Sequence, residues 1–363
     1  MNQNPIKSLS GLKREDFTKE VQGKPVDLFF LHNSAGNEVA ITNYAGAIVA
    51  IMVPDRDGNY ANVIQGHDNI DEKLTTQEPF LSTLIGRFGN RICKGKFTLD
   101  GTEYTLVCNN GANALHGGPT GFHTRVWDAE QIDGQTLHLH YHAADMEEGF
   151  PGNMEIDVVY TWTDENELKI EYKATTDKKT IVNLTNHGYF ALAGLADPTP
   201  TIEDLVCEIN ADHYLPIDET SIPYGNIDKV AGTPFDFRTP KPVGRDIDMP
   251  GDEQVKNGAG YDHCFVLNKK EVGELSFAAR IYEPHSGRTM EVYTTEPGVQ
   301  VYTNNWGTGK KGTLGATYPR RSAICFEAQH FPDSPNQPYF PSTVLCPGEV
   351  YTQTTIYKFG VKK

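Results

Sequence analysis

Short runs of β-branched and aromatic residues, separated by clusters of turn-forming residues, dominate this chain. Apolar and polar positions alternate most clearly in "LHLHYHA" (137–143), "EIDVVYTWT" (155–163) and "ELKIEYKATT" (167–176). Similar composition recurs in "EVAITNYAGAIVAIMVP" (38–54) and "GEVYTQTTIYKF" (348–359). A two-residue period is typical of strands that bury one face. The pattern therefore predicts an all-β protein.

Turn signals divide these runs, and helical periodicity is scarce. The segments "DRDGN" (55–59) and "DEN" (164–166) have the composition of tight turns. One short helix is predicted over "NIDEKLTTQ" (69–77). Because no repeat or low-complexity linker divides the chain, we predict one large antiparallel β-sandwich over residues 21–363, preceded by a loose polar N-terminal arm, residues 1–20.

The segment "TIVNLTNHGYFAL" (180–192) alternates between two kinds of side chain. As a strand it has an apolar row that consists of Val182, Leu184, Phe190 and Leu192. The opposite, polar row consists of Asn183, Thr185, His187 and Tyr189. A strand that lines a binding cleft shows this pattern, and so does a half-exposed strand with an ordinary surface histidine.

A glutamate stands in the apolar segment "SAICFEAQHF" (322–331). Alternation places Glu327 and Gln329 opposite Ile324, Phe326 and Ala328. Carboxylates in such surroundings are rarely buried unless they are paired or functional. Glu327 is therefore a candidate catalytic group, with a structural ion pair as the alternative.

Composition narrows the class of ligand. The chain has 363 residues and a formal net charge of -16. A nucleic-acid partner calls for a basic surface, and so does docking on anionic lipid, so we expect neither. A neutral small molecule fits this charge balance better than a phosphorylated one.

The cysteines and apolar runs predict a cytoplasmic protein, with a removed export leader left open. None of the six cysteines forms a CxxC pair, and Cys264 and Cys325 lie inside apolar runs. This is typical of buried reduced thiols rather than of a disulfide framework or a zinc site. No apolar run approaches the roughly 18 residues of a membrane span.

Three alternating histidines in "HLHYH" form the clearest candidate metal site outside these segments. His138, His140 and His142 would share one strand face, with a spacing that can bind zinc or copper. The intervening Leu137, Leu139 and Tyr141 supply a core-facing row, so an exposed polar face explains the motif as well. We predict no metal there.

Eight segments, in this order and spacing, resemble the galactose mutarotase (aldose 1-epimerase) family. The resemblance implies a large β-sandwich, a galactose mutarotase-like supersandwich, with a sugar bound on one concave sheet. It implies an isomerase that interconverts the α and β anomers of hexoses such as galactose and glucose. The segments are "AITNYAGAIVAIMVPDRDG", "GRFGNRI", "ALHGG", "TNHGYFAL", "YLPIDETSIPYGNIDKVAGTPFDFR", "GYDHCFVL", "PGVQVYTNN" and "CFEAQHFPDSPNQPYFPS".

The resemblance also implies roles for single residues. Glu327 matches the general base, His187 the general acid, and His116 a second active-site imidazole near the ring oxygen. Tyr189 matches an aromatic group beside the acid histidine. Residues that bind the sugar hydroxyls are matched by Asn90, Arg91, Asp262 and Gln300. The implied partner is a monosaccharide substrate, and no cofactor is implied. The protein is expected to be a monomer or a homodimer.

These residue types suit the reaction. Ring opening removes a proton from the anomeric hydroxyl and delivers one to the ring oxygen. Glutamate, with an ordinary pKa of about 4.3, can accept the first, and histidine, at about 6.5, can donate the second. We expect Asp262 to favour the protonated imidazole. We also expect an apolar wall for the sugar from Trp127, Tyr189 or Trp306.

Two alternative functions would use some of the same residues. A non-catalytic carbohydrate-binding protein on the same fold would keep Asn90, Arg91 and Asp262 without needing Glu327 and His187. An epimerase for hexose phosphates would need additional Arg or Lys side chains near the cleft.

Overall fold

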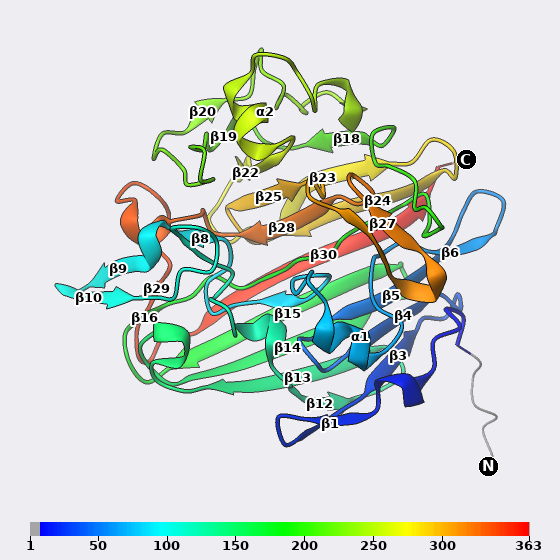
Figure 1. Cartoon of the computed structure of the whole chain (residues 1–363), viewed down its shortest axis with the longest axis horizontal. Helices are drawn as coiled ribbons and strands as arrows, with labels where there is room; N and C mark the ends of the chain where they lie inside the picture. The colour runs from blue at the N-terminus through cyan, green and yellow to red at the C-terminus, as the bar shows by residue number, and fades with distance from the viewer. Residues whose placement is uncertain (1–7, 363) are drawn as a thin grey trace.

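The computed structural model describes residues 8–362, which form a sandwich of packed antiparallel sheets (Figure 1). One layer is a single sheet of nine strands. In spatial order these are β12 (Asp128–Gln131), β13 (Thr136–Ala143), β14 (Met154–Trp162), β15 (Glu167–Thr176), β30 (Tyr351–Val361), β24 (Arg288–Thr294), β23 (Ser276–Tyr282), β18 (Val206–Ile209) and β21 (Lys241–Pro242).

The opposing layer contains two smaller sheets. The first has the order β3 (Leu28–His32), β4 (Glu38–Thr42), β5 (Ile48–Pro54) and β6 (Tyr60–Asn62). The second has the order β20 (Asp228–Lys229), β19 (His213–Tyr214), β22 (Asp262–Val266), β25 (Gly298–Tyr302) and β28 (Cys325–Gln329). This five-stranded sheet carries much of the candidate site.

Short elements connect and cover the sheets. Paired strands are β1 (Lys19–Val21) with β2 (Lys24–Val26), β7 (Leu84–Ile85) with β17 (Thr185–Asn186), β8 (Arg91–Ile92) with β11 (Ala114–Leu115), β9 (Lys96–Leu99) with β10 (Thr102–Thr105), β16 (Thr180–Ile181) with β29 (Val344–Leu345), and β26 (Thr308–Lys311) with β27 (Thr317–Pro319). The α-helices in residues 8–362 are α1 (Ile70–Thr75) and α2 (Glu253–Gly258). Short 3-10 helices include Arg14–Phe17 and Phe122–Thr124.

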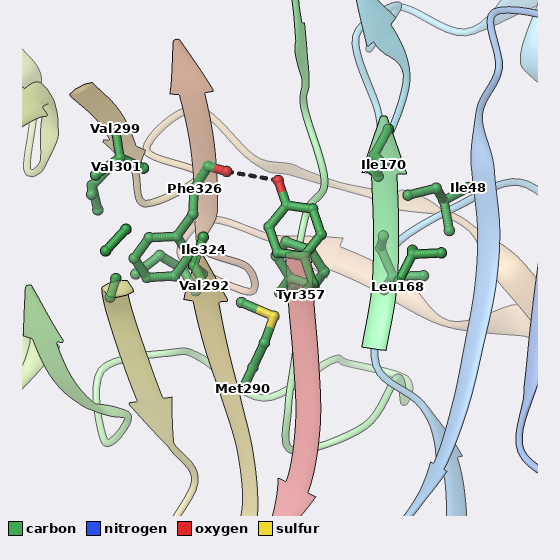
Figure 2. Packing of buried hydrophobic residues seen from close by; sticks show 14 of the residues in the cluster. Ile48, Leu168, Ile170, Met290, Val292, Val299, Val301, Ile324, Phe326 and Tyr357 are labelled. Carbon is green, nitrogen blue, oxygen red and sulfur yellow. Dashed lines mark hydrogen bonds between the residues drawn. The ribbon is translucent and has the colours of Figure 1, made fainter. Parts of the chain in front are cut away.

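The main hydrophobic core lies between the two layers. Buried and less buried residues alternate along β14 and β15, so each strand gives one face to the core. Figure 2 shows Leu168 and Ile170 of the nine-stranded sheet beside Ile48 of the four-stranded sheet. A hydrogen bond also crosses the layers, because the Tyr357 hydroxyl donates to the Phe326 carbonyl oxygen at 2.8 Å (Figure 2).

The predicted all-β class is confirmed, and most predicted strands are present. The predicted helix over 69–77 contains α1, whose Asn69 side chain caps the helix by accepting from the Glu72 backbone N–H. Helix α2 was not predicted, because six residues are too few to show a helical period. The run 38–54 forms two strands, β4 and β5, because the chain turns between them.

The segment 180–192 is less regular than its alternation predicts. It contributes only the two-residue strands β16 and β17, and its other backbone N–H groups bond to several separate segments. Val182 donates to Thr343, for example, and Phe190 to Ile324. The predicted apolar row is nevertheless buried in the main core.

The residues that precede β1 pack against the four-stranded sheet. The buried carboxylate of Glu38 accepts hydrogen bonds from the Leu9 and Ser10 backbone N–H groups at 2.7 and 3.0 Å. Leu12 and Phe17 are buried in a second hydrophobic cluster. Residues 8–20 of the predicted N-terminal arm are thus held by specific contacts, while residues 1–7 lie outside the described part.

The three alternating histidines face carboxylates on the adjacent strand. His138 and His140 both approach Asp157 Oδ1, at 2.8 and 3.0 Å, and His142 approaches Glu155 Oε1 at 2.6 Å. The intervening Leu137, Leu139 and Tyr141 are buried, as predicted. Ordinary cross-strand polar pairing therefore accounts for this motif.

The predicted free cysteines are present in the described residues. All six are unpaired thiols, but the predicted burial holds only for Cys207, Cys264 and Cys325, since Cys108 is exposed and Cys93 and Cys346 are partly exposed. Over residues 8–362, no helix combines the length and apolar character that crossing a bilayer requires.

We expect Tyr357→Phe to lower the free energy of unfolding by about 1–3 kcal/mol, because the change leaves a buried carbonyl without its partner. Urea unfolding followed by far-UV circular dichroism measures this change. Tyr339→Phe is the control: Tyr339 is 91% exposed, so its loss of a hydroxyl should change stability by less than about 0.5 kcal/mol. Equal effects of the two substitutions would show that the hydrogen bond between the layers contributes nothing.

Candidate active site

Three neighbouring strands place polar side chains on one face of the five-stranded sheet. In the β22–β25–β28 register, Gln300 pairs with Glu327 on one side and with Cys264 on the other. Asp262 lies two residues before Cys264, on the same face. The alternate residues, such as Phe326, face the core. Alternate residues of the same strands therefore face the core and the site.

A separate segment brings an imidazole to Glu327. His187 directly follows β17, where its backbone N–H donates to the Thr83 carbonyl at 2.9 Å and its carbonyl accepts from Ser82 at 3.1 Å. The Nε2 atom of His187 lies 3.5 Å from Oε1 of Glu327. Tyr189 stacks on the His187 ring, with centroids 4.9 Å apart. His187 and Tyr189 of the predicted polar row are thus buried in the site wall and are not half-exposed.

A second imidazole approaches the other oxygen of the same carboxylate. His116 Nε2 lies 4.0 Å from Glu327 Oε2. The backbone N–H of Asn90 donates to His116 Nδ1 at 3.1 Å. Because Nδ1 accepts this hydrogen bond, the proton of the neutral ring is on Nε2, so His116 presents a donor to the site.

Asn90 and His116 fix each other through their backbones as well. The His116 N–H donates to the Asn90 carbonyl at 3.1 Å, and both residues have left-handed backbone angles, with φ of 64° and 51°. The next residue, Gly117, must be a glycine, because a Cβ there would lie 2.0 Å from the Gly86 carbonyl oxygen.

The remaining polar residues form a connected group. Gln300 Nε2 donates to Asp262 Oδ1 at 2.7 Å. Arg91 Nη2 lies 3.7 Å from Asp262 Oδ2, and Arg91 Nε donates to Asn110 Oδ1 at 3.1 Å. These contacts orient a carboxylate, a guanidinium and two amides around one space.

A cavity of about 180 Å³ joins these groups. Seven of the predicted site residues line it, while Gln300 reaches it through Asp262. The seven are Asn90, Arg91, His116, His187, Tyr189, Asp262 and Glu327. The structure therefore brings together the eight residues predicted to act on or bind the sugar, although their roles stay predictions.

The aromatic wall differs in part from the prediction. Trp306 and Tyr189 line the cavity, but the suggestion of Trp127 is wrong. Trp127 is buried in the main core, where it packs against Phe122 and Tyr141. Trp127 directly precedes β12, so it lies outside the strand, and strand alternation does not fix the direction of its side chain.

Several lining residues were not predicted. Glu78 and Phe80 come from a loop after α1 that shows no periodic pattern. Tyr302, in contrast, lies two residues after Gln300 on β25, so alternation could have identified it. Asn110 and Leu115 complete the lining.

Burial controls the acid–base character of the site. Glu327 is only 2% exposed, and burial, reinforced by the charge of Asp262, raises its pKa well above the usual value. Burial also lowers the pKa of His187 to about 3. Both shifts favour the uncharged form of each group. Glu327 is therefore a strong proton acceptor when ionised, and His187 a strong proton donor when protonated.

The expectation for Asp262 needs correction. Its contacts are with Gln300 and Arg91, and its charge acts on the pKa of Glu327. It is not among the groups that shift the pKa of His187 in the described structure. Asp262 thus opposes ionisation of the carboxylate and does not hold the proton on the imidazole.

The family model and the similar proteins point to the same family. Residues 27–358 match the aldose 1-epimerase family. The chain is 44% identical to galactose mutarotase from Bos taurus over 324 residues, which cover 89% of this chain and 91% of that protein. It is 38% identical to aldose 1-epimerase from Escherichia coli (strain K12) over 342 residues, 93% of this chain and 96% of that protein.

Solved structures agree with the sequence comparison. The fold is similar to a GalM/aldose epimerase homologue from C. elegans, with a TM-score of 0.82, 29% identity and coverage of 93% of this chain and 100% of that one. Galactose 1-epimerase from Lactobacillus acidophilus NCFM gives a TM-score of 0.82, 29% identity and coverage of 95% and 97%.

The described residues contain one group of buried side chains with spacing suited to a metal ion. Ligand atoms of His116, His187 and Glu327 all lie within 4.8 Å of one another. A metal ligand needs a free lone pair, however, and the Asn90 N–H directs the proton of His116 to Nε2, the atom that faces the group. The donor set therefore does not fit a three-ligand metal site.

Accordingly, we expect stoichiometric Co²⁺ to give no intense visible absorption of a tetrahedral complex, and EDTA to leave the enzyme's activity unchanged. A Co²⁺ spectrum that disappears in His116→Asn would contradict the assigned proton position. Visible absorption titration at neutral pH is the measurement.

Proposed function

The chain is an enzyme of the aldose 1-epimerase family, and from that premise we propose that Glu327 and His187 are the base and the acid that open and reclose the sugar ring. The observation that carries this proposal is the 3.5 Å separation of His187 Nε2 and Glu327 Oε1 in one cavity. Two groups this close can act on two oxygens bonded to the same carbon.

Ring opening requires two proton transfers. Glu327 takes the proton of the anomeric hydroxyl while the bond between the anomeric carbon and the ring oxygen breaks. His187 gives its Nε2 proton to the ring oxygen, which becomes a hydroxyl, and the anomeric carbon becomes an aldehyde. Rotation about the adjacent carbon–carbon bond presents the other face, and the reverse transfers close the ring.

The pair holds one proton throughout this cycle. Before opening, the proton is on His187 and Glu327 is ionised; afterwards, it is on Glu327 and His187 is neutral. Burial favours this second, uncharged arrangement, since it raises the pKa of Glu327 and lowers that of His187. Burial of the pair thus favours the protonation states of the open-chain stage, relative to an exposed acid–base pair.

The other polar groups position the sugar. Asp262 and Gln300 are joined by a hydrogen bond of 2.7 Å, and Arg91 lies beside them, which gives both donors and acceptors for hydroxyl groups. His116 supplies its Nε2–H as a donor near the ring oxygen. Tyr189 and Trp306 offer apolar surface to the C–H face of a pyranose. We propose galactose and glucose as substrates.

The same geometry disfavours the two alternative functions. A binding protein has no need of an imidazole placed 3.5 Å from a buried carboxylate, whereas acid–base catalysis requires both groups. A phosphate group calls for several cations, yet Arg91 is the one Lys or Arg among the residues that line the cavity, and it is near Asp262. We further propose that the protein acts in the cytoplasm on free sugars, as a monomer or homodimer.

Glu327→Gln should lower kcat for mutarotation by several orders of magnitude, because an amide cannot accept the proton of the anomeric hydroxyl. Polarimetry of freshly dissolved α-D-galactose and α-D-glucose measures the rate. The matched control is Glu296→Gln, which alters another glutamate that is 3% exposed and hydrogen-bonded to an imidazole, His330, at 2.5 Å. Glu296 lines a different cavity, so this variant should keep the wild-type rate. Wild-type rates in Glu327→Gln would remove Glu327 from the mechanism.

The pH dependence of kcat/KM should follow the single proton of the pair. On the acid side, activity falls only as a second proton binds to His187, whose pKa is lowered to about 3. On the alkaline side, it falls as the pair loses its proton at the raised pKa of Glu327. We therefore expect a flat profile through the ordinary histidine pKa of about 6.5. An acid limb centred near that value would show that His187 titrates like an exposed histidine.

A further inference from the structure

A buried lysine lies close to the cavity but takes no part in the proposed chemistry. Lys73 of α1 is 4% exposed, and burial lowers its pKa to about 7. No carboxylate within residues 8–362 forms an ion pair with it. Burying a cation without a counter-ion costs free energy unless hydrogen bonds compensate, so the position of Lys73 depends on the groups to which its Nζ donates.

The ammonium group holds the loop that follows the helix. Lys73 Nζ donates to the carbonyl oxygens of Pro79 and Leu81 at 3.1 and 3.3 Å. These two residues flank Phe80, so the hydrogen bonds fix the backbone on both sides of one aromatic residue. The loop also carries Glu78, and both Glu78 and Phe80 line the sugar cavity.

Phe80 in turn covers the imidazoles of the site. Its ring centroid lies 4.7 Å from that of His116, 4.6 Å from His123 and 6.3 Å from His187. His123 is buried as well, and burial lowers its pKa to about 3. Phe80 therefore contributes to the burial of these imidazoles, and burial is the main cause of the lowered pKa values of His187 and His123.

We propose that Lys73 is a positioning residue for the reaction, whose buried ammonium group fixes residues 79–81 so that Phe80 closes the sugar cavity over His187 and His116. The inference rests on the proposed function of that cavity. Lysine suits the task because it offers three N–H donors on a stem long enough to reach from a helix to two carbonyl oxygens of the following loop.

A purely structural role is the competing explanation, and a second lysine separates the two. Lys241 is 3% exposed and donates to a loop carbonyl, that of Pro234, but it is also paired with Asp246 at 2.7 Å. Neither Lys241 nor its partners line the sugar cavity. Lys241→Met is therefore a control for the loss of a buried lysine away from the site.

The test is a double-mutant cycle on KM, with Lys73→Met, Phe80→Ala and the double variant assayed by polarimetry on galactose. Each single change should raise KM about tenfold, the size of one aromatic contact. If Lys73 acts through Phe80, the double variant should also show about tenfold; independent effects would multiply to about 100-fold. Lys241→Met should lower the midpoint of urea unfolding without changing KM.

Each outcome decides between the explanations. A wild-type KM in Phe80→Ala, effects that multiply, or an equal KM rise in Lys241→Met would overturn the proposal, and the first of these needs no folded Lys73 variant. Failure of the acid–base assignment would appear instead as wild-type kcat in Glu327→Gln. The KM cycle would stay informative in that case, because it measures closure of the cavity and not proton transfer.

Discussion

The approach of the buried side chains of Glu327 and His187 at the wall of one cavity is the constraint on which the site depends. Two ionisable side chains 3.5 Å apart, each almost fully buried, cannot titrate independently. Burial drives both toward their neutral forms, so that the pair carries one proton and no net charge. A sugar that contacts both groups converts this shared proton into a catalytic one, since one of its oxygens accepts a proton from the imidazole and the other gives one to the carboxylate.

The sandwich makes this contact possible because a strand has two faces. Along β28, Phe326 enters the core and bonds through its carbonyl oxygen to Tyr357 of the nine-stranded sheet, while Glu327 faces the cavity. The packing of the two layers thus fixes the position of the carboxylate to within the tolerance of a packed core. His187 comes from an irregular segment, and its backbone is fixed instead by hydrogen bonds to Ser82 and Thr83.

Sequence patterns predicted the parts of the molecule in which apolar and polar residues alternate regularly. Two-residue periodicity located β13, β14 and β15, and it placed Glu327 opposite core residues. It failed where tertiary contacts decide the conformation. The 180–192 segment bonds to several partners and forms little regular strand, and Trp127 is a core residue although it resembles a sugar-stacking group. Neither Phe80 nor Lys73 could be selected, because their pairing depends on a loop that folds back over the helix before it.

Buried charged groups in this fold differ in how their charge or hydrogen-bonding capacity is satisfied. Glu38 and Lys241 are buried with charged or multiple hydrogen-bonding partners, which is how structural polar groups are normally satisfied. Glu327 keeps one oxygen without a hydrogen-bond partner in the described residues, and Lys73 bonds to two backbone carbonyl oxygens without a counter-ion. Both lie at the same cavity, one facing it and one behind its wall. The proposed reaction needs a carboxylate that is free to bind a proton and a firmly held wall beside it, and these are the roles that Glu327 and Lys73 would fill.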